Sequence, residues 1–254
     1  MVTTRSASKA PSTPAPAHSG GSRKSGGTTA SSSRAGSVSR ASAGSSSPSS
    51  SRGPAPWAHA PSRLTLLWLA VSLPLVTWDS AYVLLRPWSM EGGSLHWPLW
   101  VPYRLYGEVD HIYGWKAFHA HTGFTAAQSL LNVLETAFYL AYLWIYLASS
   151  SSPSSSSDAT PRARALAGRP AAIAVLVAFS AAVMTLSKTV LYWLNEYFSG
   201  FDNIGHNPPR DLVLLWIIPN GLWLVFPTYL IYVLGGEIVE GLTAASTAVS
   251  VKSE

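Results

Sequence analysis

The sequence predicts an all-α membrane protein, a bundle of four transmembrane helices that follows a disordered N-terminal tail. Hydrophobic residues make up 48% of the 254-residue chain and charged residues only 11%. The apolar residues are concentrated in four segments of about the twenty residues that a helix needs to cross a bilayer. None of the segments alternates as a barrel strand would, so helices are expected. The segments lie near residues 64–85, 124–147, 170–195 and 212–234.

Residues 1–60 form the predicted tail, which is rich in Ser, Ala, Gly, Pro and Arg. Its large apolar side chains are too few to offset the entropy cost of ordering the chain, so disorder is expected. Because no acidic residue precedes Asp79, the basic tail favours contact with anionic lipid headgroups. A nucleic acid is a less favoured partner, since no aromatic side chain before Trp57 can stack on a base.

The distribution of Lys and Arg predicts the orientation. The tail and the loop from Ala148 to Arg169 are basic, whereas the segments that follow the first and third spans are balanced or acidic. Both termini are therefore expected in the cytosol. Residues 61–236 would form the membrane domain and residues 237–254 a short flexible tail. The loop from Ala148 to Arg169 opens with a Ser-rich run at 149–157 and is interpreted as a flexible linker.

Polar residues inside the spans indicate a functional site. Asp79 and Glu135 are the most informative, because a carboxylate within a bilayer is costly and usually has a function. Helix geometry places them, with Lys188 and Asn220, about 10 to 16 Å from the same end of their spans. Asn132 precedes Glu135 by three residues and shares its helix face. The similar depth predicts one intramembrane cavity.

Other interpretations remain open for these residues. Asp79 could pair with Lys188 only to hold two helices together, or Lys188 could extend to the headgroups. Asn220, between Pro219 and Gly221, could satisfy the backbone at a local break in its helix. The segment between the first two spans contains several His residues without metal-ligand spacing, so no metal or other cofactor is expected. This segment is expected to cover the cavity as a lid.

Aromatic side chains surround the predicted polar groups. An apolar pocket with a few polar atoms suits a rigid lipid, and aromatic faces also stabilise a cation. The aromatic residues assigned to this lining are Trp78, Tyr82, Phe138, Tyr139, Tyr142, Tyr192, Trp223 and Phe226.

Three segments resemble the final two helices of the emopamil-binding protein family: Lys188-Thr-Val-Leu-Tyr-Trp-Leu-Asn-Glu196, Gly200-Phe201 and Pro219-Asn220-Gly-Leu-Trp223-Leu-Val-Phe-Pro227. Glu135-Thr136 resembles that family's Glu-Thr pair. Asp79 lies where members carry an acidic residue, and Asp110 resembles the aspartate of the lumenal loop. The resemblance covers about residues 64–235. It is to the EXPERA domain, the four-helix unit of sterol isomerases and sigma-type receptors.

The resemblance implies a multi-pass protein of the endoplasmic reticulum that binds a sterol or a sterol-like cationic amphiphile. The alternative is a sterol double-bond isomerase of the Δ8–Δ7 type, which works through a carbocation. In that case Asp79 and Glu135 would be the catalytic acid–base pair. Asn220, Trp223, Lys188, Asn132, Tyr139, Tyr192, Trp78 and Asp110 would bind the substrate. Membrane lipid and a second copy of the chain, in a homo-oligomer, are the other partners left open.

Two differences from the isomerase pattern favour a binding protein over an enzyme. The isomerases have a His one helical turn before the first acidic residue, where this chain has Leu75. They also have a hydroxyl residue three positions after the glutamate, where this chain has Phe138. A third alternative is a chaperone or trafficking factor whose intramembrane polar groups bind another protein's helix.

Overall fold

Four helices of the chain are long and apolar enough to cross a membrane, as the sequence predicts. They are Arg63–Leu84, Phe124–Ser149, Gly168–Phe198 and the continuous helical stretch Pro209–Thr247. The computed structural model describes residues 57–149 and 165–252. The chain is therefore a multi-pass membrane protein, and its four predicted spans are confirmed.

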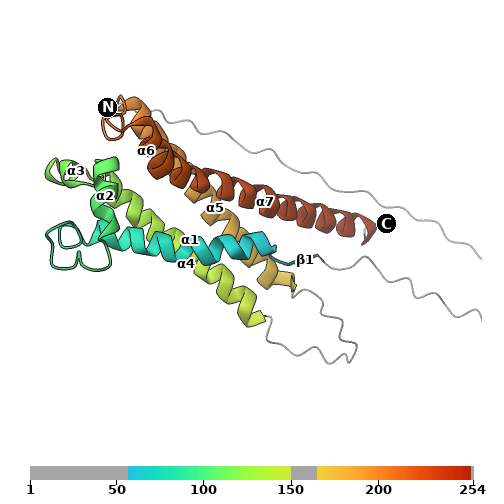
Figure 1. The fold of residues 1–254 in the computed structure, drawn as a ribbon. Coiled ribbons are helices and arrows are strands. Elements are labelled where there is room, and N and C mark those ends of the chain that lie inside the picture. The colour runs from blue at the N-terminus through green and yellow to red at the C-terminus, as the bar shows by residue number, and fades with distance from the viewer. Residues whose placement is uncertain (1–56, 150–164, 253–254) are drawn as a thin grey trace, which may run out of the picture. The chain divides into compact units, whose positions relative to one another are not determined.

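The long helices pack in sequence order (Figure 1). Helix α1 (Arg63–Leu84) packs on α4 (Phe124–Ser149), α4 packs on α5 (Gly168–Phe198), and α5 packs on α7 (Ile218–Lys252). Helix α5 can contact both neighbours closely because its buried surface is rich in small residues. These residues are Ala171, Ala174, Ala178, Ala181 and Ala182.

Local signals fix both ends of α1. The Ser62 hydroxyl accepts a hydrogen bond from the backbone N–H of Thr65 at 3.0 Å, which satisfies one of the free donors at the helix start. The helix ends at Leu84, shortly before Arg86, whose helical conformation is disfavoured by Pro87. The carboxylate of Asp79 therefore lies in the second-last turn of α1.

The last span changes its winding near Pro219. A short α6 (Pro209–Asp211) leads into the π-helix η1 (Leu212–Ile217), which continues as α7. Pro219 has no N–H to donate, and Asn220 Nδ2 donates to the backbone oxygen of Trp216 at 2.8 Å. Asn220 thus supports the backbone where the winding changes, as one of the two interpretations of this residue expects.

Helix α7 is longer than predicted. Residues 237–252 were expected to be a flexible tail, but they continue the helix. The pair Gly235-Gly236 does not end it, because the following turns are fixed by side-chain contacts. Glu237 accepts hydrogen bonds from Trp57 and His59, and Trp57 packs on Gly241.

The prediction of a disordered tail is wrong for residues 57–60. Strand β1 (Ala58–His59) pairs antiparallel with β2 (Leu166–Ala167), which lies in the loop expected to be a linker. The His59 ring is buried, with Nδ1 at 2.6 Å from Glu237 Oε2 and Nε2 at 2.9 Å from Tyr142 Oη. These contacts join the chain ahead of α1 to α4 and α7. Most of the predicted tail and of the Ser-rich run lies outside the described residues.

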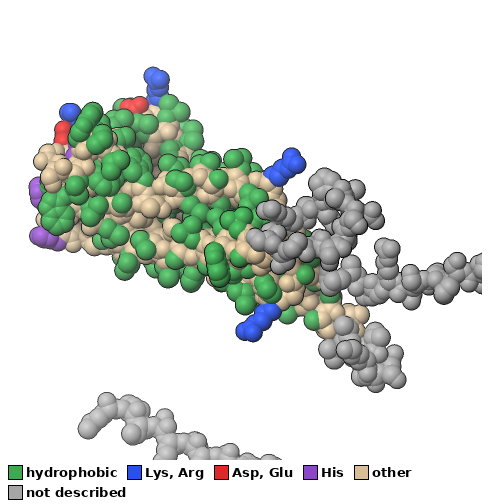
Figure 2. Space-filling model, turned by 90° about the horizontal axis from the view of Figure 1, so that it is seen from below, with side chains coloured by type: hydrophobic (Ala, Val, Ile, Leu, Met, Phe, Trp, Pro, Cys, Tyr) green, Lys and Arg blue, Asp and Glu red, His purple; other side chains and the backbone are tan. Residues whose placement is uncertain are grey.

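The segments that follow the first and third spans form a cap at one end of the bundle. The cap contains α2 (Pro102–Val109), α3 (Trp115–His119) and the loop 199–208. Lys116 Nζ lies 2.7 Å from Asp202 Oδ2, and Asn207 Nδ2 donates to the Val109 oxygen at 2.7 Å, so the two connecting segments are tied together. Charged and His side chains gather toward the two ends of the domain, and hydrophobic side chains cover the surface between them (Figure 2).

Candidate functional site

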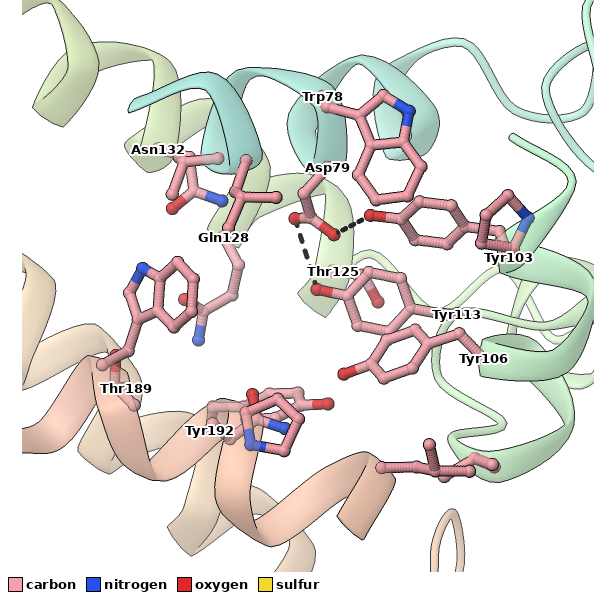
Figure 3. A pocket seen from close by; sticks show the side chains of 18 of the residues that line it. Trp78, Asp79, Tyr103, Tyr106, Tyr113, Thr125, Gln128, Asn132, Thr189 and Tyr192 are labelled. Atoms are coloured by element: carbon pink, nitrogen blue, oxygen red, sulfur yellow. Dashed lines mark hydrogen bonds between the residues drawn. The ribbon is translucent and has the colours of Figure 1, made fainter. Parts of the chain in front are cut away.

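A cavity of about 470 Å³ lies between the cap and the long helices (Figure 3). Its volume is within the range of typical small-molecule sites, and its lining is mainly apolar and aromatic. Most of the predicted site residues line it: Trp78, Asp79, Asn132, Lys188, Tyr192, Asn220 and Trp223. The lid prediction agrees with the structure, since Tyr103, Leu105, Tyr106, Val109 and Tyr113 of the cap also line the cavity.

The carboxyl group of Asp79 is held by two phenols of the cap (Figure 3). Tyr103 Oη donates to Oδ1 at 2.6 Å, and Tyr113 Oη approaches Oδ2 at 3.4 Å. Burial raises the pKa of both phenols well above their ordinary value, so the two groups stay protonated and donate. No ion pair of the described part of the chain includes Asp79.

Aromatic stacking sets the position of Tyr103. Its ring stacks on Tyr82 with centroids 3.8 Å apart, and the Trp78 ring lies 4.8 Å from it. Trp78 Nε1 in turn donates to the backbone oxygen of Leu99 at 2.9 Å. These contacts join α1 to the cap, so Asp79 and its two phenols keep one relative geometry.

Lys188 does not pair with Asp79, and the proposed structural ion pair between them is wrong. Lys188 Nζ lies 2.9 Å from Glu135 Oε2 and also donates to Asn132 Oδ1. The Thr185 hydroxyl donates to the same Glu135 oxygen at 2.8 Å. The Lys188 side chain is only 9% exposed, which also contradicts an extension to the headgroups.

The structure separates Glu135 and Tyr139 from the main cavity. Both residues line a second, much smaller cavity of about 20 Å³, and Val76 and Trp223 line both cavities. The two carboxylates were expected to share one cavity, which the structure contradicts. Asp79 and Glu135 lie at similar depths along their helices. The side chain of Glu135, however, points to the Lys188 ammonium and not into the main cavity.

Asp110 does not line the cavity either. It is fully buried at the end of α2, where it accepts hydrogen bonds from the Tyr192 hydroxyl, from Trp216 Nε1 at 2.8 Å and from the N–H of Ile112 at 3.1 Å. Burial raises the pKa of Asp110 to about 6, and the hydrogen bonds act in the opposite direction. Asp110 therefore positions Tyr192, which does line the cavity, instead of contacting a ligand.

Sequence reasoning did not find Tyr103 and Tyr113, the partners of Asp79. The available signal was weak, since it consisted of several tyrosines in an aromatic segment that follows the first span. Within residues 57–149 and 165–252, no group of three or more His, Cys, Asp or Glu side chains is placed to hold a metal ion.

The arrangement can perform two kinds of chemistry. A carboxylate among aromatic faces can bind a cation, and a carboxyl group beside a protonated phenol can exchange a proton. Lys188, Asn132 and Asn220 add polar groups elsewhere in the lining. Comparison of the chain with family models, with curated proteins and with solved structures gave no match in any of the three.

Proposed function

We propose that this membrane protein binds a sterol-like cationic amphiphile in the 470 Å³ cavity, within a bundle of the EXPERA type. The observation that carries the proposal is the carboxylate of Asp79, which lines an aromatic cavity and forms no ion pair among the described residues. A buried carboxylate without a cation is costly. The ammonium group of a ligand would supply the partner.

The other lining residues support the same ligand class. The rings of Trp78, Tyr103 and Tyr113 lie close to Asp79, and aromatic faces attract a cation electrostatically. Apolar side chains such as Leu105 and Leu215 complete the cavity and offer contact area to a fused-ring skeleton. A rigid amphiphile with a basic nitrogen matches both parts of this lining.

The proposed location is the endoplasmic reticulum, with the cap in the lumen and both termini in the cytosol. Arg63 and Arg169 support this orientation, because they lie at the first turns of α1 and α5, at the end of the bundle away from the cap. Basic residues favour the cytosolic side of a membrane protein.

Binding of a radiolabelled steroidal amine to the full chain tests the proposal. Asp79→Asn removes the charge at nearly constant shape, and we expect it to weaken binding about 10- to 100-fold, the range for a hydrogen-bonded charged contact. Glu240→Gln is the control, since it removes a negative charge from an exposed position on α7. Equal affinity of the Asp79→Asn variant and the unchanged chain would contradict the proposal.

A sterol double-bond isomerase is the second candidate, and one contact favours it. The Tyr103 hydroxyl donates a hydrogen bond to Asp79 at 2.6 Å and would orient its carboxyl group, in a chain that lacks the His of the isomerases. Asp79 would protonate the ring double bond and then accept the proton from the neighbouring carbon of the carbocation. Glu135 lies outside the main cavity and is paired with Lys188, so the single carboxyl would act in both steps.

Mass spectrometry of a ring-unsaturated sterol incubated with the protein separates the two candidates. Migration of the double bond that is lost in Asp79→Asn would establish the isomerase. Binding of the sterol without migration of the double bond would support the binding protein.

A further inference from the structure

We infer that the ligand of this cavity has two polar ends, a basic nitrogen that binds Asp79 and a neutral acceptor oxygen that binds Asn132 and Lys188. The inference rests on the proposed function, which supplies the contact with Asp79. It adds the chemical identity of the opposite end of the ligand and the residues that recognise it.

The ammonium of Lys188 has a donor left for a ligand. An ammonium carries three N–H donors and no acceptor. Two acceptors contact Lys188 among the described residues, namely Glu135 Oε2 at 2.9 Å and Asn132 Oδ1. Because Lys188 also lines the main cavity, the third donor is available on the cavity side.

The same contact fixes the orientation of the Asn132 amide. Since an ammonium only donates, the oxygen of the Asn132 amide must face Lys188. Its NH₂ group then points away from Lys188, and it donates to no acceptor within the described residues. Asn132 lines the cavity, where Figure 3 shows it apart from the group formed by Asp79, Tyr103 and Tyr113. Lys188 and Asn132 therefore each offer a donor to a ligand at this part of the lining.

The Asp79 part of the lining has the opposite polarity. Its carboxylate is an acceptor, and the hydroxyl hydrogens of Tyr103 and Tyr113 are directed at that carboxylate. A ligand with a donor or cation at one end and an acceptor at the other would bind to this lining in a single orientation. Polar groups of this kind fix the orientation of a ligand in an otherwise apolar pocket.

The charge of Lys188 decides the type of acceptor. Its ammonium is already paired with Glu135 at 2.9 Å. A ligand carboxylate at this position would lie close to the Glu135 carboxylate, and like charges at short distance repel strongly in a buried site. A carbonyl or hydroxyl oxygen accepts the free hydrogen bonds without that repulsion, so the acceptor is neutral.

A matched pair of ligands tests the inference on the full chain in detergent. One probe is a steroid with a tertiary amine at one end and a ketone at the other, and the second has a methylene in place of the ketone. We expect the ketone to bind the unchanged protein about tenfold more tightly, as for one hydrogen bond to a charged group.

Two variants locate the oxygen site. Asn132→Leu removes the amide donors at similar volume. The double variant Lys188→Met with Glu135→Gln removes the cation together with its counter-ion, so that no unpaired charge stays buried. We expect the tenfold preference for the ketone to fall severalfold in each variant and to persist in Glu240→Gln. A preference that survives undiminished in either variant would overturn the inference, so a single measurable variant is enough for the test.

The outcomes for the two proposals are distinguishable. If the unchanged protein binds both probes equally and Asp79→Asn weakens both, the proposed function stands and the two-ended ligand is wrong. If neither probe binds the unchanged protein, both proposals are wrong.

Discussion

The Nζ atom of Lys188 lies 2.9 Å from Oε2 of Glu135, so an ion pair joins α5 to α4 inside the membrane-spanning bundle. Both side chains are nearly inaccessible, with exposed fractions of 9% and 5%. The pairing explains why two intramembrane carboxylates have different surroundings. Glu135 is paired with a cation, whereas the side-chain partners of Asp79 among the described residues are two phenols.

Substituting one residue of this ion pair is expected to destabilise the protein more than substituting both residues. Lys188→Met leaves a buried carboxylate without its cation and should lower the free energy of unfolding by about 3 to 5 kcal/mol. Adding Glu135→Gln should restore much of that loss, because the unpaired charge disappears. A double-mutant cycle by denaturant unfolding in detergent measures the coupling. The cycle for Lys188→Met with Glu240→Gln, at an exposed position on α7, is the control and should be additive.

The two phenols that hold Asp79 are expected to contribute unequally. Tyr103 donates at 2.6 Å and Tyr113 approaches at 3.4 Å, near the limit for a hydrogen bond. Tyr103→Phe should therefore lower the free energy of unfolding by about 1.5 to 3 kcal/mol, and Tyr113→Phe by less. Unfolding experiments in the Asp79→Asn background provide the check, since the difference between the two substitutions should shrink there. The reverse order of the two losses would contradict this assignment.

Asp110 is expected to make stability depend on pH. Its pKa is about 6 in the folded protein against 3.8 for an ordinary Asp, so the folded state binds more protons between these values. The contribution of Asp110 to stability should then be greatest below about pH 4 and should fall as the pH rises to about 6, by up to about 3 kcal/mol. Thermal unfolding across this range measures the slope. In Asp110→Asn the slope should be reduced, whereas an identical slope in both proteins would assign it to other groups.

The contacts of His59 are expected to hold the start of the membrane domain in place. His59→Ala removes hydrogen bonds to Glu237 and Tyr142 and should lower the free energy of unfolding by about 1 to 3 kcal/mol. Hydrogen exchange of residues 57–62 should become faster at the same time. His119→Ala changes an exposed His of the cap and serves as the control. Unchanged exchange at residues 57–62 would show that strand pairing alone holds this segment.

The spans and much of the cavity lining were predictable because their signals are local. The length of an apolar run identifies a membrane helix, and the depth of Asp79, Lys188 and Asn220 along their helices places them at a similar level in the membrane. The pairing of Lys188 with Glu135 was not predictable. It depends on the rotation of α4 and α5 about their axes, which depth does not specify.

The cap and the first strand were less predictable, because tertiary contacts create them. Nothing near His59 in the sequence indicates burial, which results from Glu237 and Tyr142 on two distant helices. Likewise, Tyr103 reaches Asp79 only because α2 folds back onto α1. The EXPERA relationship, the sterol-like ligand and the endoplasmic reticulum stay predictions.

Trp223 lines both cavities, and its ring packs edge-on against Trp68 with centroids 5.2 Å apart, while Trp68 stacks on Phe226 at 4.2 Å. The indole is therefore a fixed partition between two chambers that hold carboxylates of different character. A smaller residue at position 223 would merge the chambers and let a ligand reach the carboxylate that Lys188 neutralises. Together with Val76, which also lines both cavities, this indole lies between the chamber of Asp79 and the chamber of Glu135.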